Sequence, residues 1–344
     1  MLSVKNPIMT GFFPDPSICR VGNKFYTVHS TFAYFPGVPV FESEDLVHWN
    51  LISNVLDRDS QVPLSGCQHS EGIFAPTIRY HKGTWYMITT NVSDQGNFIV
   101  TAKDPRGPWS EPYYLGESTG GIDPSLFFDD DGTCYYIGQR PRSAGYRYNG
   151  DCEIWIQTLD LDTMQLKPDA TIVLTGFQRK AIWPEGPHLY KKDGYYYILH
   201  AESGTSIHHS VMIARSKNVF GPYEYCPCNP ILTHRHLGAQ YPVTCVGHAD
   251  LVDDGNGNWY MVVLACRPNQ GYTLLGRETF LAKVTWEDGW PVVNAGVGHL
   301  EEVVTLPYEG QPSDDVPQCK TYTFDTPSLP LELLTLRNHR DHEL

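Results

Sequence analysis

Three acidic residues of this sequence stand beside prolines: Asp15 in the segment PDPSI, Asp123 in GIDPSL and Glu185 in WPEGPHL. Two carboxyls in different environments can cleave a glycosidic bond, because one protonates the leaving oxygen while the other activates water. A third carboxylate nearby raises the pKa of the acid by like-charge repulsion and keeps it protonated. Each residue alone is also explained as a turn cap, so the chemistry depends on whether the fold brings all three together.

The elements that would hold these residues form an internal repeat. Each copy has a short motif that ends in an aliphatic residue, then a turn, then an aromatic strand. The five copies start roughly 50 to 60 residues apart and cover residues 14–18 with 24–29, 75–78 with 84–90, 123–126 with 133–138, 185–189 with 194–200, and 247–251 with 258–265.

A further β-like run follows each copy, at residues 38–41, 98–102, 153–158, 210–215 and 279–284. Five units of three or four short strands, with loops rich in Gly, Asp and Pro, predict an all-β, five-bladed β-propeller. A sandwich or a barrel fits less well, because blades stacked around an axis bury both faces of every sheet. The alternative is a coincidental Gly and aromatic periodicity in another all-β fold.

The repeat predicts that the carboxyls converge. When the copies are aligned on their closing aliphatic residues, the residues three places earlier are Asp15, Ala75, Asp123, Gly186 and His248, and Glu185 directly precedes Gly186. Equivalent ends of the innermost strands crowd around the axis of a propeller. Three carboxylates and one histidine are therefore expected to be neighbours there.

Composition narrows the function classes. The 344 residues include 39 acidic and 25 basic side chains, a formal charge of −14, which argues against a nucleic-acid partner because such binding rests on basic contacts to phosphates. The longest apolar run, residues 259–266, is far shorter than the roughly 20 residues that cross a bilayer, so no membrane span is expected. The 41% hydrophobic content excludes a disordered chain, and the 12% aromatic content fits carbohydrate as one ligand class.

Cysteine usage and the N-terminal residues bear on the compartment. Nine cysteines at scattered positions cannot all pair within the chain, so reduced structural thiols are expected. Residues 1–10 lack the apolar core of a secretory signal. From the sequence as written, we expect a cytoplasmic protein.

Long segments around these residues match a known family. They are NPIMTGFFPDPSI (6–18), YFPGVPVFESEDLVHWNLISNVLDR (34–58), GIFAPTIRY (72–80), GIDPSLF (121–127), AIWPEGPHLY (181–190), GHADLV (247–252) and LGRETFLAKVTWEDGWPVVNAGV (275–297). In these segments the chain closely resembles glycoside hydrolase family 43, in its β-xylosidase and α-L-arabinofuranosidase branch. The resemblance covers nearly the whole chain, and such long collinear matches are far more specific than any one short motif.

The resemblance implies a role for each carboxyl. Asp15 is the expected general base, Glu185 the general acid, and Asp123 the residue that tunes and orients the acid. Members of this family invert configuration by direct displacement, which predicts that the carboxyls of Asp15 and Glu185 lie about 6.5 to 9.5 Å apart. Phe32 and Phe74 resemble the aromatic walls of the sugar pocket, although by residue type alone both would be core residues.

Two further residues resemble family positions near the sugar. Arg277 is expected to hydrogen-bond the terminal sugar; its alternative is an exposed ion pair with Glu278. His248 resembles the histidine near the propeller axis, by which some relatives hold a water-coordinated divalent cation such as calcium. A single imidazole is weak evidence of a metal site, so no metal ligand is assigned, no cofactor is required, and a structural histidine is the favoured interpretation.

The expected organisation is a catalytic propeller over residues 1–308, followed by residues 309–344 as a linker and the truncated beginning of a C-terminal β-sandwich. The function expected is an inverting exo-glycosidase that releases terminal β-D-xylosyl units from β-1,4-xylooligosaccharides and also α-L-arabinofuranosyl groups. The alternatives are an α-L-arabinofuranosidase as the main activity, a non-catalytic sugar-binding propeller, and an endo-acting arabinanase. The partner expected is a xylooligosaccharide or arabinoside substrate, and the oligomeric state is left open.

Overall fold

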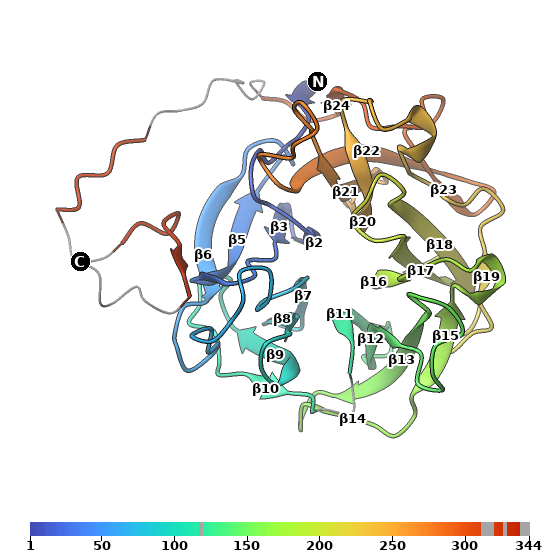
Figure 1. Ribbon diagram of the computed structural model, residues 1–344, viewed down its shortest axis with the longest axis horizontal. Coiled ribbons are helices and arrows are strands. Elements are labelled where there is room, and N and C mark those ends of the chain that lie inside the picture. Colours follow the sequence, from blue (N-terminus) through green and yellow to red (C-terminus); the bar gives the residue numbers. More distant parts are fainter. Residues whose placement is uncertain (117–119, 311–319, 326–328, 338–344) are drawn as a thin grey trace.

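The computed structural model describes residues 1–116, 120–310, 320–325 and 329–337. Five antiparallel sheets radiate around a central axis (Figure 1). Apart from two short 3-10 helices, η1 (Phe177–Arg179) and η2 (Arg235–Leu237), the regular elements in these ranges are strands. The prediction of an all-β, five-bladed propeller is confirmed.

Each sheet is one blade, and its strands follow one another in sequence from the axis outward. The first blade consists of β2 (Ser17–Val21), β3 (Lys24–Val28), β5 (Gly37–Ser43) and β6 (Asn50–Leu56). The second consists of β7 (Thr77–His81), β8 (Thr84–Asn91), β9 (Gly96–Ala102) and β10 (Tyr113–Tyr114). The third consists of β11 (Ile122–Phe128), β12 (Cys134–Pro141), β13 (Cys152–Asp160) and β14 (Gln165–Leu166), with β15 (Thr171–Thr175) also pairing with β13.

The fourth blade consists of β16 (Glu185–Lys192), β17 (Tyr195–Glu202), β18 (Ser210–Ser216) and β19 (Glu224–Tyr225). The fifth consists of β20 (Thr244–Asp253), β21 (Trp259–Cys266), β22 (Glu278–Glu287) and β23 (Trp290–Val293). The repeat located the three inner strands of every blade. It did not locate the outermost ones, which differ in length from blade to blade: β6 has seven residues and β23 four, whereas β10, β14 and β19 have two each.

The hydrophobic core is divided among the five gaps between neighbouring blades. One buried cluster, for example, joins Val40 of blade one to Met87 of blade two, and another joins Leu199 of blade four to Val263 of blade five. Equivalent clusters fill the other three gaps. Every sheet is therefore covered on both faces, which is why its strands are rich in aromatic and β-branched residues on both sides.

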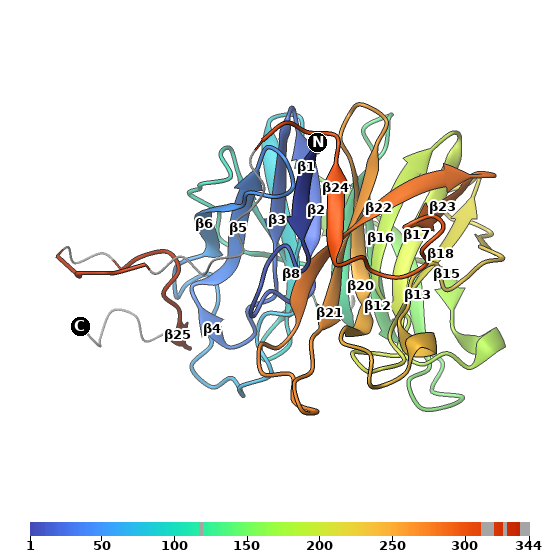
Figure 2. The same cartoon turned by 90° about the horizontal axis from the view of Figure 1, so that it is seen from above.

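The ring closes through the N-terminal segment. Strand β1 (Leu2–Lys5) pairs with β24 (Val303–Leu306), outside the five blades (Figure 2). Asn6 then bonds to both backbone groups of Leu281 in β22, donating from Nδ2 at 2.8 Å and accepting at Oδ1 at 2.8 Å. These contacts hold blade five to the segment that leads into blade one.

Residues 329–337 lie against the first blade. Strand β25 (Thr335–Leu336) pairs with β4 (Tyr34–Phe35), and the Arg337 Nε donates to the backbone oxygen of Cys67 at 2.8 Å. Part of the segment expected to begin a β-sandwich, residues 311–319, 326–328 and 338–344, lies outside the described residues. The division at residue 308 and the sandwich both stay predictions.

Two further expectations concern cysteines and membranes. The eight cysteines within the described ranges are free thiols, and Cys319 lies outside those ranges. Among the described residues, no helix has the length and apolar character that crossing a membrane requires.

Candidate active site

The innermost strands begin in the same unusual backbone conformation. Asp15, Asp123, Gly186 and His248 have φ angles of 52°, 55°, 57° and 51°, a left-handed region that non-glycine residues rarely adopt. These are four of the five positions that the sequence repeat aligned, Ala75 being the exception. In β11, β16 and β20 the pairing register shifts at this point. Such bulges redirect side chains and are common beside active sites, and here they repeat in three of the five blades.

Asp15 is a buried carboxylate held in its ionised form. Its Oδ2 accepts a hydrogen bond from Ser30 Oγ at 2.6 Å, and its Oδ1 accepts one from Arg277 Nη1 at 2.9 Å. Burial alone would raise the pKa of Asp15, but Arg277, His248 and the Ser30 hydroxyl together hold this pKa below its usual value of 3.8. Asp15 can therefore accept a proton at neutral pH.

Glu185, in contrast to Asp15, is held in its protonated form. Burial, followed by the charges of Asp123 and Asp15, raises the pKa of Glu185 well above its usual value of 4.5. Asp123, whose Oδ2 accepts a hydrogen bond from the Gly186 backbone N–H at 3.0 Å, has its own pKa raised by burial to about 6. Asp123 therefore anchors the backbone next to Glu185, and its charge favours the protonated form of Glu185.

His248 and Gly186 fit together at the axis. A Cβ at Gly186 would lie 2.9 Å from His248 Cε1, so the residue after Glu185 must lack a side chain on grounds of space as well as of φ. His248 Nδ1 lies 3.9 Å from Asp15 Oδ1, and the histidine is 7% exposed. The structure thus places His248 among the carboxyls, where the sequence favoured a purely structural histidine.

His209 is the site residue that sequence reasoning missed. Its ring packs on Gly247, where a Cβ would lie 2.4 Å from His209 Cδ2, and its Nδ1 lies 3.0 Å from the Cys245 backbone oxygen. Its buried Nε2 has no hydrogen-bond partner among the described residues. Burial lowers the pKa of His209 to about 4, so the ring is neutral. In the sequence His209 directly follows His208, and nothing there distinguishes His209 as a residue of the site.

Arg277 and two phenylalanines border the carboxyls. The guanidinium of Arg277 lies over the Phe32 ring at 4.9 Å from its centroid, and the Phe32 and Phe74 rings are 5.3 Å apart. Arg277 pairs with Asp15, whereas Glu278 pairs with Arg267 at 2.7 Å. The exposed Arg277–Glu278 ion pair, one alternative from the sequence, is therefore wrong. Phe32 is 9% exposed, so it serves the core and this border together.

The surroundings of His248 do not form a calcium site by direct ligation. Calcium takes six to eight oxygen ligands. Both oxygens of the nearest carboxylate, Asp15, already accept hydrogen bonds from Ser30 and Arg277. Within the described residues, no group of three or more His, Cys, Asp or Glu side chains has an arrangement that could hold a metal ion.

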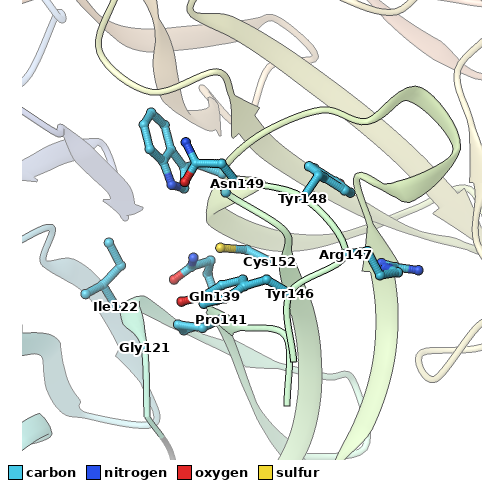
Figure 3. A pocket seen from close by; sticks show the side chains of 11 residues that line it. Gly121, Ile122, Gln139, Pro141, Tyr146, Arg147, Tyr148, Asn149 and Cys152 are labelled. Atoms are coloured by element: carbon cyan, nitrogen blue, oxygen red, sulfur yellow. The ribbon is translucent and has the colours of Figure 1, made fainter. Parts of the chain in front are cut away.

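A cavity of about 580 Å³ is lined by residues of blade three and its loops, together with Trp183 from the segment before β16 (Figure 3). Its lining includes Ile122, Gln139, Tyr146, Cys152 and Trp183. Ile122 directly precedes Asp123, and Trp183 stands two residues before Glu185. Burial and, among lesser influences, the charge of Glu185 raise the pKa of the Cys152 thiol to about 11. The cavity therefore adjoins the carboxyl that can donate a proton.

The aromatic rings of this cavity are open to solvent. Tyr146 is 65% exposed and Trp183 is 40% exposed. Trp183 has a φ of 48° and packs over Gly204, where a Cβ would lie 2.8 Å from its ring. Its backbone N–H donates to the Gly150 oxygen at 2.8 Å. The indole is thus fixed in place while part of it stays available to a ligand.

Known proteins share this sequence and this fold. The model of glycosyl hydrolases family 43 matches residues 4–291. A xylosidase/arabinosidase of Butyrivibrio fibrisolvens is 66% identical over 307 residues, which cover 89% of this chain and 59% of that protein. A non-reducing end alpha-L-arabinofuranosidase of Bacteroides ovatus is 44% identical over 346 residues, covering 97% of this chain and 61% of that protein.

A solved structure agrees with the sequence matches. The crystal structure of a xylan beta-1,4-xylosidase from Bacillus halodurans C-125 has a TM-score of 0.87 and 40% identity, covering 97% of this chain and 64% of that one. The chain thus spans roughly three fifths of the length of these relatives, 59% and 61% for the two above. With a family model that matches 4–291 of its 344 residues, the chain belongs to family 43 of the glycosyl hydrolases.

Proposed function

We propose that this chain is an inverting exo-glycosidase that releases terminal β-D-xylosyl units from β-1,4-xylooligosaccharides, and that it also accepts α-L-arabinofuranosides. The observation that carries the proposal is the contrast between two buried carboxyls. The pKa of Asp15 is held low by Arg277 and Ser30, while burial and two like charges hold the pKa of Glu185 high. One accepts a proton at neutral pH and the other has a proton to give.

The mechanism follows from these two states. A water molecule attacks the anomeric carbon and gives a proton to the Asp15 carboxylate, while Glu185 protonates the leaving glycosidic oxygen as its bond to carbon breaks. Asp15 then returns its proton to solvent and Glu185 regains one, so water and glycoside are converted to two sugars with no net change in the protein. No metal ion or cofactor enters these steps.

The surrounding groups would bind the two halves of the substrate. The side chain of Arg277 is 23% exposed and contacts the buried Asp15. The neutral His209, which is near enough to Asp15 to influence its pKa, has a buried Nε2 with no hydrogen-bond partner among the described residues. Both can hydrogen-bond hydroxyls of the terminal sugar. The cavity next to Glu185, with its exposed Trp183 and Tyr146 rings, would take the leaving group.

The names of two relatives support activity on a second sugar. One relative is a xylosidase/arabinosidase and another is an alpha-L-arabinofuranosidase. A terminal xylopyranosyl and an arabinofuranosyl group present similar hydroxyl patterns to one pocket. Rates on the two 4-nitrophenyl glycosides, with and without EDTA, would rank the two activities. An arabinofuranoside rate far above the xyloside rate would make arabinofuranosidase the main activity.

Proton NMR of the first sugar released from a β-xyloside tests the mechanism. Inversion gives α-xylose first, and initial release of β-xylose would exclude it. Asp15→Asn and Glu185→Gln variants test whether the propeller is catalytic at all: a sugar-binding propeller would show no turnover in the unmodified protein, and xylobiose affinity would be unchanged in both variants. Cleavage of linear arabinan without release from aryl β-xylosides would favour an endo-acting arabinanase instead.

A further inference from the structure

A second polar layer lies directly behind the carboxyls. In the aligned repeat, the residue before each closing aliphatic position is polar, and the innermost strands of the five blades contribute Ser17, Thr77, Ser125, His188 and Asp250. Arg79 of the second blade, two residues after Thr77 on the same strand, joins this layer. All of these side chains except Arg79 are buried polar groups of the axis.

Asp250 is the centre of this layer. Its Oδ2 accepts hydrogen bonds from Ser17 Oγ at 2.8 Å and from the Ile18 backbone N–H at 3.0 Å, both in blade one. The same oxygen pairs with Arg79 Nη1 of blade two at 3.0 Å, and Oδ1 accepts from the Tyr190 hydroxyl of blade four. The side chain of Asp250 is 0% exposed. One carboxylate of blade five thus bonds to three other blades.

The charge on Asp250 is fixed by its partners. Burial would raise its pKa, but Arg79 foremost, then His188 and the hydroxyl of Tyr190, lower this pKa to about 2. Asp250 and Arg79 therefore form an ion pair at the axis. Because the interior screens charges weakly, such a pair fixes the relative position of the elements that carry it, whatever its net contribution to stability.

Arg79 extends the layer to the remaining blades. Its Nη2 donates to His188 Nδ1 at 3.1 Å, and Ser125 Oγ lies 3.0 Å from the same nitrogen. Burial lowers the pKa of His188 to about 3, so the ring is neutral and Nδ1 is free to accept from both donors. Blades three and four are thereby tied to the pair of blades two and five.

Three members of this layer lie two or three residues along the chain from a carboxyl of the proposed active site. Ser17 stands two residues after Asp15, Ser125 two after Asp123, and His188 three after Glu185. Two residues along a strand span about 6.6 Å. A displacement of the layer would therefore be passed to the carboxyls over only two or three residues of backbone.

We infer that Asp250, with Arg79 and His188, positions the catalytic carboxyls of Asp15 and Glu185 relative to each other. This inference rests on the proposed glycosidase function. Asp250 fixes the strand of the base through Ser17 and Ile18, and Arg79 fixes the strand of the acid through His188. Neither touches the substrate, so both are positioning residues.

The fold supplies a matched control on the same two strands. Arg20 of β2 pairs with Asp253 of β20 at 2.9 Å, so it also joins blades one and five. Its side chain is 27% exposed and that of Asp253 is 40% exposed, at the far end of both strands from the carboxyls. Surface pairs of this kind contribute little to stability. Losing the Arg20–Asp253 pair removes an interblade contact without disturbing the layer at the axis.

The experiment compares Asp250→Asn and Ser17→Ala with Asp253→Asn in the full chain. For each we measure kcat and KM on xylobiose and on 4-nitrophenyl β-D-xyloside, together with Tm. A nitrophenolate leaves readily without protonation, whereas the sugar of xylobiose needs the proton of Glu185. Loss of folded protein lowers both kcat values in the same proportion, but misplacement of Glu185 lowers kcat on xylobiose more.

We expect Asp250→Asn to lower kcat on xylobiose by about 10 to 100-fold, since a displacement of about 1 Å in a site costs on that order. KM should change little, and the ratio of the two kcat values should fall. Ser17→Ala, which removes the hydroxyl bonded to Asp250 but leaves the Asp250–Arg79 ion pair in place, is the variant expected to fold in any case and should lower kcat several-fold. Arg79→Lys should restore part of the kcat that Arg79→Met loses, and Asp253→Asn should match the unmodified protein.

Unchanged kcat ratios in folded Asp250→Asn and Ser17→Ala proteins would overturn the inference, as would an equal effect of Asp253→Asn. Failure of the proposed function looks different, because the unmodified protein would then hydrolyse neither substrate.

Discussion

Replacing Arg277 by methionine should move the whole pH profile of the enzyme to higher pH. The arginine is the strongest of the influences that lower the pKa of Asp15, and it also lowers the pKa values of Asp123 and Glu185. Methionine keeps much of the apolar stem of the side chain and removes the charged guanidinium, which lies over the Phe32 ring. Without that charge, the effect of burial on the Asp15 carboxyl is no longer offset.

The size of the effect follows from the Arg277–Asp15 contact. Nη1 and Oδ1 are 2.9 Å apart, and the Asp15 carboxylate is buried. Charges centred about 4 Å apart interact by about 4 kcal/mol at an effective dielectric constant of 20, or about 3 pKa units. Because the arginine is 23% exposed, we expect a rise of about 1 to 3 units in the pKa of Asp15. The rise for Asp123 and Glu185 should be smaller, since neither forms the direct ion pair.

The sign of the shift can be checked on both limbs. Activity on the acid side is lost when the Asp15 carboxylate gains a proton, so a higher pKa of Asp15 moves this limb to higher pH. Activity on the alkaline side is lost when Glu185 releases its proton, so that limb also moves up. The profile of kcat/KM on 4-nitrophenyl β-D-xyloside measures both limbs for the free enzyme.

Arg20→Met is the control for loss of a cation. Arg20 is 27% exposed and pairs with an aspartate at 2.9 Å, much as Arg277 does, but it acts on none of the three carboxyls. The acid and alkaline limbs of the pH profile of the Arg20→Met variant should coincide with those of the unmodified protein. If the acid limb of Arg277→Met also coincides with them, Asp15 is not the base, or Arg277 does not hold it ionised.

Three further variants test the remaining parts of the site. Asp123→Asn removes a charge that raises the pKa of Glu185, so the alkaline limb should move to lower pH; an unmoved limb would show that Asp123 does not tune the acid. Glu185→Gln should lower kcat on xylobiose by about 10² to 10⁴-fold and on the nitrophenyl xyloside by much less, and an equal loss on both would contradict the role of proton donor. Trp183→Ala should raise KM for xylotriose by up to about tenfold through loss of an aromatic contact to the leaving group, and an unchanged KM would place the leaving group elsewhere.

The sequence by itself determined the architecture and the positions of the carboxyls. Five copies of one strand pattern can bury their faces only by stacking, which is why the propeller could be predicted from spacing alone. The same alignment placed Asp15, Asp123 and His248 at equivalent positions. The structure gives these residues and Gly186 one shared left-handed conformation.

Tertiary structure decided the electrostatics and the partners. Arg277 lies next to Glu278 in the chain, yet it pairs with Asp15, 262 residues away, because β22 brings it to the axis. The positions of His209 and Trp183 depend on tertiary packing against Gly247 of β20 and against Gly204. The layer around Asp250 joins residues of five blades, and no pattern within one repeat reveals a contact between repeats. A periodic pattern can be read from the order of residues alone. A pKa or an ion pair depends on distances across the axis, and these distances exist only after the ring of blades has closed.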